Sequence, residues 1–172
     1  MVYEKYREIA QEMIMAGVRA ADPTQAVLDS VQLRDNVLTV RGDTFDLADY
    51  DKVLVFGIGK AAAPMASALE QIVECDGGLV ITKKGDEIGD VEVKSIPVYQ
   101  AYHPEPRREN VEYSSKILDE INALDPKSRT LVFFLITGGG SALFSVPPEG
   151  ISIDELFRMN ELLMHCGANI YD

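Results

Sequence analysis

The sequence is short of the features that mark several classes of protein. It has only two cysteines, Cys75 and Cys166, among 172 residues, and they form no C-x-x-C pair. Disulfide frameworks and zinc sites need more cysteines or another spacing, so we expect two reduced thiols and no metal site. No stretch approaches the roughly 18 apolar residues of a membrane span. Residues 1–20 lack the apolar core of a signal peptide. These absences predict a cytoplasmic protein with no membrane partner.

Basic residues are also scarce. The chain carries 16 Lys and Arg against 28 Asp and Glu, which gives a formal net charge of -12. An acidic surface repels a phosphate backbone, so we expect no nucleic-acid partner. A small anionic ligand is compatible with this charge, because a loop of backbone N–H groups binds phosphate locally. Hydrophobic residues make up 47% of the chain, which predicts one domain over residues 1–172.

The first 50 residues predict a helix, a shorter helix and a hairpin. Apolar residues recur at helical spacing over residues 2–20. Asp22 followed by Pro23 is typical of a helix start, and the second helix is expected to end near Ser30. Residues 31–40 contain two short apolar runs around Arg34-Asp35-Asn36, which is typical of a hairpin.

From residue 51 onward, short apolar runs alternate with helical stripes. The runs cover residues 52–56, 79–82, 95–101 and 130–136, and the stripes cover residues 61–72 and 111–124. Apolar runs without alternation are typical of strands in a sheet covered on both faces. Their alternation with helices predicts an α/β fold with a mainly parallel sheet, whose strand order is not readable from the sequence. Ser152 and Glu155 have capping-box spacing, which predicts a last helix that ends near Gly167.

A glycine-rich segment, Gly57-Ile58-Gly59-Lys60, follows the first of these runs. The next helix would point its free N–H groups at an anion there, and the Lys60 ammonium group would reach the same anion. A Walker A loop is excluded, because Leu54 stands where that loop needs a glycine and Ala61 where it needs Ser or Thr. The alternative is that the glycines only close a strand–helix turn.

The same segment partly fits a dinucleotide-binding fingerprint. Gly57, Gly59 and Ala62 match the pattern G-x-G-x-x-A. That fingerprint also needs an acidic residue near the end of the next strand, where this chain has Lys83 and Lys84. NAD is therefore disfavoured, and an NADP-binding dehydrogenase domain stays as an alternative.

Three consecutive glycines follow the last apolar run, in Thr137-Gly138-Gly139-Gly140-Ser141. Such a run costs conformational entropy, and a mere turn rarely needs it. An anion-binding nest, helped by the hydroxyls of Thr137 and Ser141, explains the cost better. A nucleophile elbow is disfavoured, because Leu143 stands where that motif needs its last glycine.

A histidine lies between the two glycine clusters, in Tyr102-His103-Pro104-Glu105-Pro106. The prolines predict a rigid loop. His103 would hydrogen-bond a ligand or transfer a proton, and the alternative is a histidine that only holds its own loop together.

Taken in order, three segments of the chain resemble the glycerate 2-kinase family, whose later domain is called MOFRL. They are residues 55–62, 102–106 and 136–143, and the resemblance continues through residues 161–170. The resemblance implies a Rossmann-like three-layer α/β domain, preceded here by the N-terminal helix and hairpin. It also implies transfer of a phosphoryl group from ATP to D-glycerate, giving 2-phosphoglycerate, with Mg²⁺.

The resemblance also assigns roles to residues. Lys60 would be the catalytic or phosphate-stabilising residue. Phosphate or substrate would be bound by the residues Gly57, Gly59, His103, Thr137, Gly138, Gly139, Gly140 and Ser141. Arg107 stands where family members carry an acidic residue, which puts a role for an acid there in doubt. The sequence suggests no residue as a ligand of the metal ion.

Family members are much longer than this chain. We therefore expect that the C-terminal MOFRL domain, or a complementing chain, is missing, and that the 172-residue chain alone has little kinase activity. A non-enzymatic module that binds sugar phosphates is a further alternative. The sequence leaves the oligomeric state open, with a homo-oligomer among the states considered, and it does not separate glycerate from related hydroxy acids.

Overall fold

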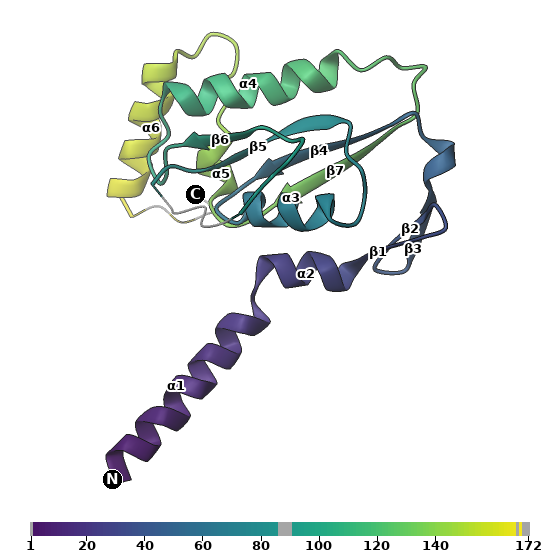
Figure 1. Cartoon of the computed structure of the whole chain (residues 1–172). Helices are drawn as coiled ribbons and strands as arrows, with labels where there is room; N and C mark the ends of the chain where they lie inside the picture. Colours follow the sequence, from purple (N-terminus) through teal and green to yellow (C-terminus); the bar gives the residue numbers. More distant parts are fainter. Residues whose placement is uncertain (1, 86–90, 168, 170–172) are drawn as a thin grey trace.

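The computed structural model describes residues 2–85, 91–167 and 169. Two helices and a small antiparallel sheet come first, and a parallel sheet covered by helices follows (Figure 1). Among the described residues, no helix has both the length and the apolar character needed to cross a membrane.

The N-terminal helices lie where the sequence predicts them. Helix α1 (Val2–Ala20) projects away from the rest of the chain, and α2 (Pro23–Ser30) follows it (Figure 1). The Asp22 carboxylate accepts hydrogen bonds from the backbone N–H groups of Thr24 at 2.8 Å and Gln25 at 3.2 Å. The cap therefore satisfies N–H groups that have no partner within the helix.

The predicted hairpin is confirmed and has a third strand. Strands β1 (Val31–Arg34), β2 (Val37–Val40) and β3 (Asp43–Asp46) form an antiparallel sheet in that order. Asp35 and Asn36 have positive φ angles of 47° and 69°, which suits the turn of a two-residue hairpin. Strand β3 was not predicted, because its sequence contains only one apolar residue. The 3-10 helix η1 (Leu47–Asp49) leads into the main sheet.

The main sheet has four parallel strands, which confirms the predicted α/β class. They are β4 (Lys52–Ile58), β5 (Gly77–Lys83), β6 (Val98–Ala101) and β7 (Thr130–Ile136), in the order β6-β5-β4-β7. The chain moves outward from β4 to β5 and β6, and then returns to the other side of β4 as β7. Ligands of open α/β sheets bind where the order reverses in this way, here at the carboxyl ends of β4 and β7.

Helices cover both faces of this sheet, so the three-layer prediction is confirmed. Helix α3 (Ala62–Glu70) lies on one face together with α2, and α4 (Arg108–Asn122) lies on the other (Figure 1). The short helix α5 (Gly140–Leu143) follows β7, and α6 (Ile153–His165) stands at one end of the sheet.

Side chains of successive strand residues enter two separate cores. In β4, Val53 and Val55 pack with the α3 side, whereas Leu54 and Phe56 pack with the α4 side. This alternation explains why the inner strands β4 and β5 are apolar on both faces, since helices cover both faces there. Strand β7 lies at the edge, and its Ile136 side chain is 69% exposed.

The last helix begins at the predicted capping box. The Ser152 hydroxyl accepts from the Glu155 N–H at 3.2 Å, and the Glu155 carboxylate accepts from the Ser152 N–H at 2.8 Å. Gly167, with φ of 76°, follows directly after the C-cap residue Cys166. Its left-handed conformation is the usual way to end a helix at glycine. Ala168 and Ile170, which the family resemblance includes, lie outside the described residues.

Candidate anion-binding site at the switch point

The two glycine-rich loops start at the same level of the sheet. Ile58 of β4 and Ile136 of β7 are register partners, so the loops leave the sheet side by side. The Thr137 N–H donates to the Ile58 carbonyl at 2.9 Å, and the Lys60 N–H donates to the Gly138 carbonyl at 3.0 Å. These hydrogen bonds join the two segments that sequence analysis singled out separately.

A hydroxyl and a glycine make this junction tight. The Thr137 Oγ1 accepts from the backbone N–H of Ala61 at 3.1 Å. Gly59 has φ of 134°, and a Cβ there would collide with the Thr137 side chain. Glycine is therefore needed at position 59 for the close approach of two loops as well as for its backbone angle.

Gly57 lies away from these loops, inside strand β4. It is buried, and an added Cβ would lie 2.8 Å from Val80 Cγ2 and 3.2 Å from Ala62 Cβ. The structure thus gives Gly57 a packing role between β5 and α3. Its predicted contact with phosphate or substrate stays a prediction.

The triple-glycine loop meets His103 and Lys60. Gly139 has φ of 88°, and a Cβ there would lie 2.8 Å from His103 Cδ2 and 3.3 Å from Lys60 Cε. Loops that follow β4, β6 and β7 therefore converge on one point. Gly138 is exposed, with nothing within 4 Å of an added Cβ, whereas Gly140 begins α5.

A groove of about 410 Å³ opens beside this convergence. It is lined by Ile58, Ile136, Thr137, Gly139, Gly140, Ser141 and Phe144. The isoleucine and phenylalanine side chains give it apolar walls, and the glycine loop gives it backbone polar groups. A small organic anion fits such a mixed surface. Thr137 is half-buried, and Ser141 is exposed at the groove.

Cationic side chains surround the residue before His103. The Lys84 ammonium group donates to the Tyr102 hydroxyl at 3.0 Å, and this hydrogen bond raises the pKa of Lys84. The Arg107 guanidinium carbon lies 4.3 Å from the centre of the Tyr102 ring. Arg107 therefore stacks on an aromatic ring of the histidine loop.

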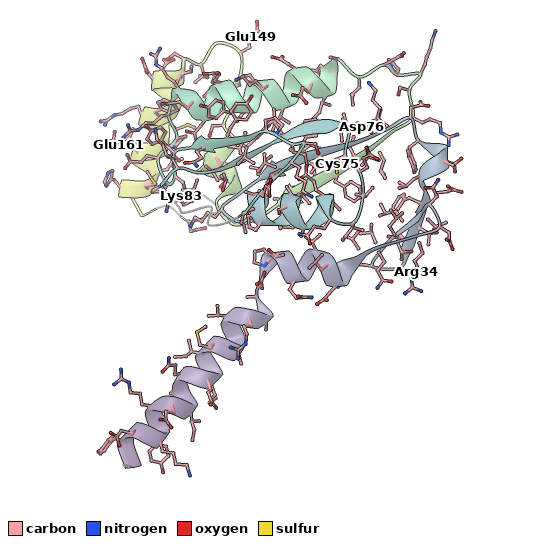
Figure 2. The ribbon with its side chains drawn as sticks, viewed as in Figure 1. Arg34, Cys75, Asp76, Lys83, Glu149 and Glu161 are labelled. Atoms are coloured by element: carbon pink, nitrogen blue, oxygen red, sulfur yellow. The ribbon has the colours of Figure 1, made fainter. Side chains whose placement is uncertain are left out.

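Within the part of the chain that the structure describes, no three or more His, Cys, Asp and Glu residues gather as a metal site. Figure 2 shows Lys83 and Glu161 toward the α6 end of the sheet, with Cys75 and Asp76 toward the opposite end. Both cysteines are free thiols, Cys75 buried and Cys166 exposed.

Two buried polar residues behind these loops were not predicted from the sequence. Asn110 and Ser114 of α4 are polar, yet both are fully buried. In the sequence they are a pair of polar residues four positions apart in a helix with an apolar stripe. Their burial depends on contacts with loops that are distant in sequence, so the pattern alone did not predict a role for them.

Known proteins resemble this chain in sequence. A family model described as "Domain of unknown function (DUF4147)" matches residues 9–172. A glycerate 2-kinase from Pyrococcus horikoshii is 37% identical over 172 residues, which is 100% of this chain and 38% of that protein. A protein from Agrobacterium vitis, provisionally named hydroxypyruvate reductase, is 30% identical over 95% of this chain and 34% of its own length.

Solved structures resemble the fold. A crystal structure of a protein from Pyrococcus horikoshii has a TM-score of 0.81 at 38% identity, and the match covers 96% of this chain and 36% of that chain. A glycerate kinase from Thermotoga maritima has a TM-score of 0.75 at 28% identity, and the match covers 98% of this chain and 37% of that chain. The chain thus spans little more than a third of the length of these relatives.

Proposed function

Because the chain belongs to the DUF4147 family, the N-terminal domain of glycerate kinases, we propose that it supplies the anion-binding half of a glycerate 2-kinase. In this proposal, ATP donates its γ-phosphoryl group to the 2-hydroxyl of D-glycerate, and 2-phosphoglycerate forms. Residues 1–172 act as the N-terminal domain. The rest of the active site belongs to a C-terminal domain like the one that the longer relatives have room for.

One observation carries the proposal: Lys60, His103 and Gly139 meet at the switch point of the sheet. An added Cβ on Gly139 would touch both other side chains, at 2.8 Å from His103 Cδ2 and 3.3 Å from Lys60 Cε. Phosphoryl transfer depends mainly on positioning and on stabilising negative charge. An ammonium group beside a glycine loop supplies both functions in a chain whose overall charge is -12.

The residues divide these tasks. The exposed Lys60 ammonium group neutralises negative charge on the bound phosphate or carboxylate. Helix α3 begins at Ala62, so the partial positive charge of its N-terminus faces the same region. The glycine loop of residues 138–140 lets an anion approach the backbone, and the hydroxyl of Ser141 lies at the groove that would hold the glycerate carbons. His103 hydrogen-bonds the ligand.

Magnesium needs several oxygen ligands. Phosphoryl transfer normally uses Mg²⁺ held by carboxylates and by phosphate oxygens. No carboxylate cluster that could hold a metal ion occurs among residues 2–85, 91–167 and 169. In this proposal the nucleotide phosphates and the remainder of the longer protein hold the ion.

Thermal unfolding of the purified chain tests the proposal. We expect 2-phosphoglycerate or ATP·Mg²⁺, at about 100 times its Kd, to raise Tm by roughly 5–10 °C. The change Lys60→Ala should abolish the shift, because it removes the ammonium group. Lys52→Ala is the matched control, since Lys52 is an exposed lysine at the opposite end of β4. The ligand should raise the Tm of Lys52→Ala as much as it raises the Tm of the unmodified chain.

Two outcomes would contradict the kinase proposal. If neither phosphorylated ligand shifts Tm, this chain lacks the anion site. If NADPH shifts Tm and the other ligands do not, the dehydrogenase alternative is favoured. Two observations favour that alternative. Gly57, Gly59 and Ala62 match the dinucleotide-binding fingerprint, and the Agrobacterium vitis relative carries the provisional name of a reductase. Against it, the Thr137 side chain fills the space beside Gly59 that a pyrophosphate would need.

A further inference from the structure

A single buried amide makes four hydrogen bonds behind the candidate site. The Asn110 Oδ1 accepts from the backbone N–H groups of Tyr102 at 3.1 Å and Arg107 at 3.0 Å. Its Nδ2 donates to the carbonyls of Tyr102 at 2.8 Å and Ala142 at 2.9 Å. An amide side chain offers two donor hydrogens and two acceptor lone pairs, so Asn110 uses its full capacity.

These four hydrogen bonds close one loop and attach it to another. Tyr102 and Arg107 flank the segment that contains His103, so the amide draws the two ends of that segment together. Ala142 belongs to α5, which begins at the last glycine of the triple-glycine loop. Asn110 therefore lies between the two loops whose side chains meet at Gly139 and His103.

Ser114, one helical turn further along α4, extends the connection. Its hydroxyl donates to the Asn110 carbonyl at 2.6 Å and accepts from the Ser145 N–H at 3.0 Å. Both side chains are fully buried. The bond from the Arg107 N–H caps the start of α4, whereas the bonds to Tyr102 and Ala142 join α4 to segments outside the helix. A residue that served α4 alone would need no contact with Ala142.

We infer that Asn110 is a positioning residue that sets the distance between the His103 loop and the triple-glycine loop. The inference rests on the proposed function, because it concerns the same anion site. Asparagine is required since the pocket presents two N–H groups and two carbonyls. Alanine would leave all four without the amide, and aspartate would place oxygen against both carbonyls. With the spacing lost, the anion site loses its affinity while the helices stay folded.

NMR and ligand binding together test this inference. The chain has two histidines, His103 and His165, so the His103 ring signals are readily assigned with the variant His165→Gln. We expect an NOE between His103 Hδ2 and a Gly139 Hα, because the Gly139 Cβ position lies 2.8 Å from His103 Cδ2. Asn110→Ala should lose this NOE and bind 2-phosphoglycerate at least about tenfold more weakly.

The matched control is Asn122→Ala, which removes an exposed asparagine at the last residue of the same helix. This control should keep both the NOE and the affinity. Retention of either the NOE or the affinity in Asn110→Ala, judged on a protein with normal far-UV circular dichroism, would overturn the inference.

Amide hydrogen exchange tests the inference on the unmodified chain, without any substitution. The N–H groups of Tyr102 and Arg107 should exchange much more slowly than in an unstructured peptide, because both donate to a buried acceptor. Exchange at the unstructured rate would overturn the inference even if Asn110→Ala does not fold. If the unmodified chain binds no phosphorylated ligand, the proposed function fails, and the NOE and the exchange rates still decide the role of Asn110.

Discussion

The backbone N–H of Ala61 donates to the Thr137 hydroxyl at 3.1 Å, although the two residues are 76 positions apart in the sequence. The loop after β4 is in this way fixed to the loop after β7. A side chain that sequence analysis assigned to ligand binding thus already has a structural partner. The bond also holds the start of α3 beside the triple-glycine loop.

Removing this hydroxyl should destabilise the fold. Thr137→Val keeps the branched shape but leaves the part-buried Ala61 N–H without its acceptor. We expect the free energy of unfolding to fall by about 1–2 kcal/mol. Urea denaturation measures the change. Thr44→Val, in the exposed part of β3, is the control and should stay within about 0.5 kcal/mol of the unmodified chain. Equal losses in the two variants would show that the Ala61–Thr137 bond contributes nothing specific.

Gly139→Ala should lower the free energy of unfolding by more than its backbone angle alone explains. Gly139 and Gly150 have nearly equal φ angles of 88° and 85°, but only Gly139 has neighbours within 4 Å of an added Cβ. Alanine at either position carries roughly 1 kcal/mol of strain. In urea denaturation, we expect the free energy of unfolding to fall by about 1–2 kcal/mol more in Gly139→Ala than in Gly150→Ala, because the methyl group at position 139 overlaps His103. It should also weaken binding of 2-phosphoglycerate. Identical behaviour of the pair would contradict the contact with His103.

The carboxylate of Glu70 predicts a pH dependence of stability. Partial burial alone would raise its pKa, but hydrogen bonds from the Ser95 hydroxyl and from the N–H groups of Lys94 and Ser95 lower the pKa from 4.5. A group with a lowered pKa in the folded state stabilises the fold above its unfolded pKa. That stabilisation is lost as the pH falls from 4.5 through the folded pKa.

Glu70→Gln should therefore lower stability at pH 7 by less than about 1 kcal/mol, since the carboxylate is largely solvated. The difference from the unmodified chain should shrink as the pH falls below 4.5. Urea denaturation at a series of pH values measures it. Glu120→Gln, on the exposed side of α4, serves as the control. A difference that grows toward low pH would contradict the direction assigned to the Glu70 pKa.

The two thiols should react at very different rates. Burial, followed by the charges of Glu70, Asp76 and Glu74, raises the pKa of Cys75 to about 11. Cys166 is exposed. Because the thiolate is the reactive form, iodoacetamide at pH 8 should modify Cys166 and leave Cys75 intact until the chain unfolds. Mass spectrometry locates the label. In Cys166→Ser, rapid labelling of the native protein would show that Cys75 is accessible.

The sequence by itself determined the elements whose signals are local. The Asp22 cap, the Ser152–Glu155 capping box and the strand at residues 130–136 all lie where the sequence predicted them. Each depends on residues within a few positions of one another, or on burial that makes a strand apolar along its whole length. The family resemblance of the loop motifs also came from the sequence, and the family model and the solved relatives bear it out.

Only the tertiary structure decided how the glycine loops relate to one another. The strand order β6-β5-β4-β7 places the loops at residues 59 and 137 side by side, and no local pattern encodes that order. Gly57 is a packing residue because Val80 lies against it, and Asn110 connects loops because Tyr102 and Ala142 lie on either side. Contacts between residues this distant in sequence arise from packing of the whole sheet, so the shape of the site became readable only once the chain was folded.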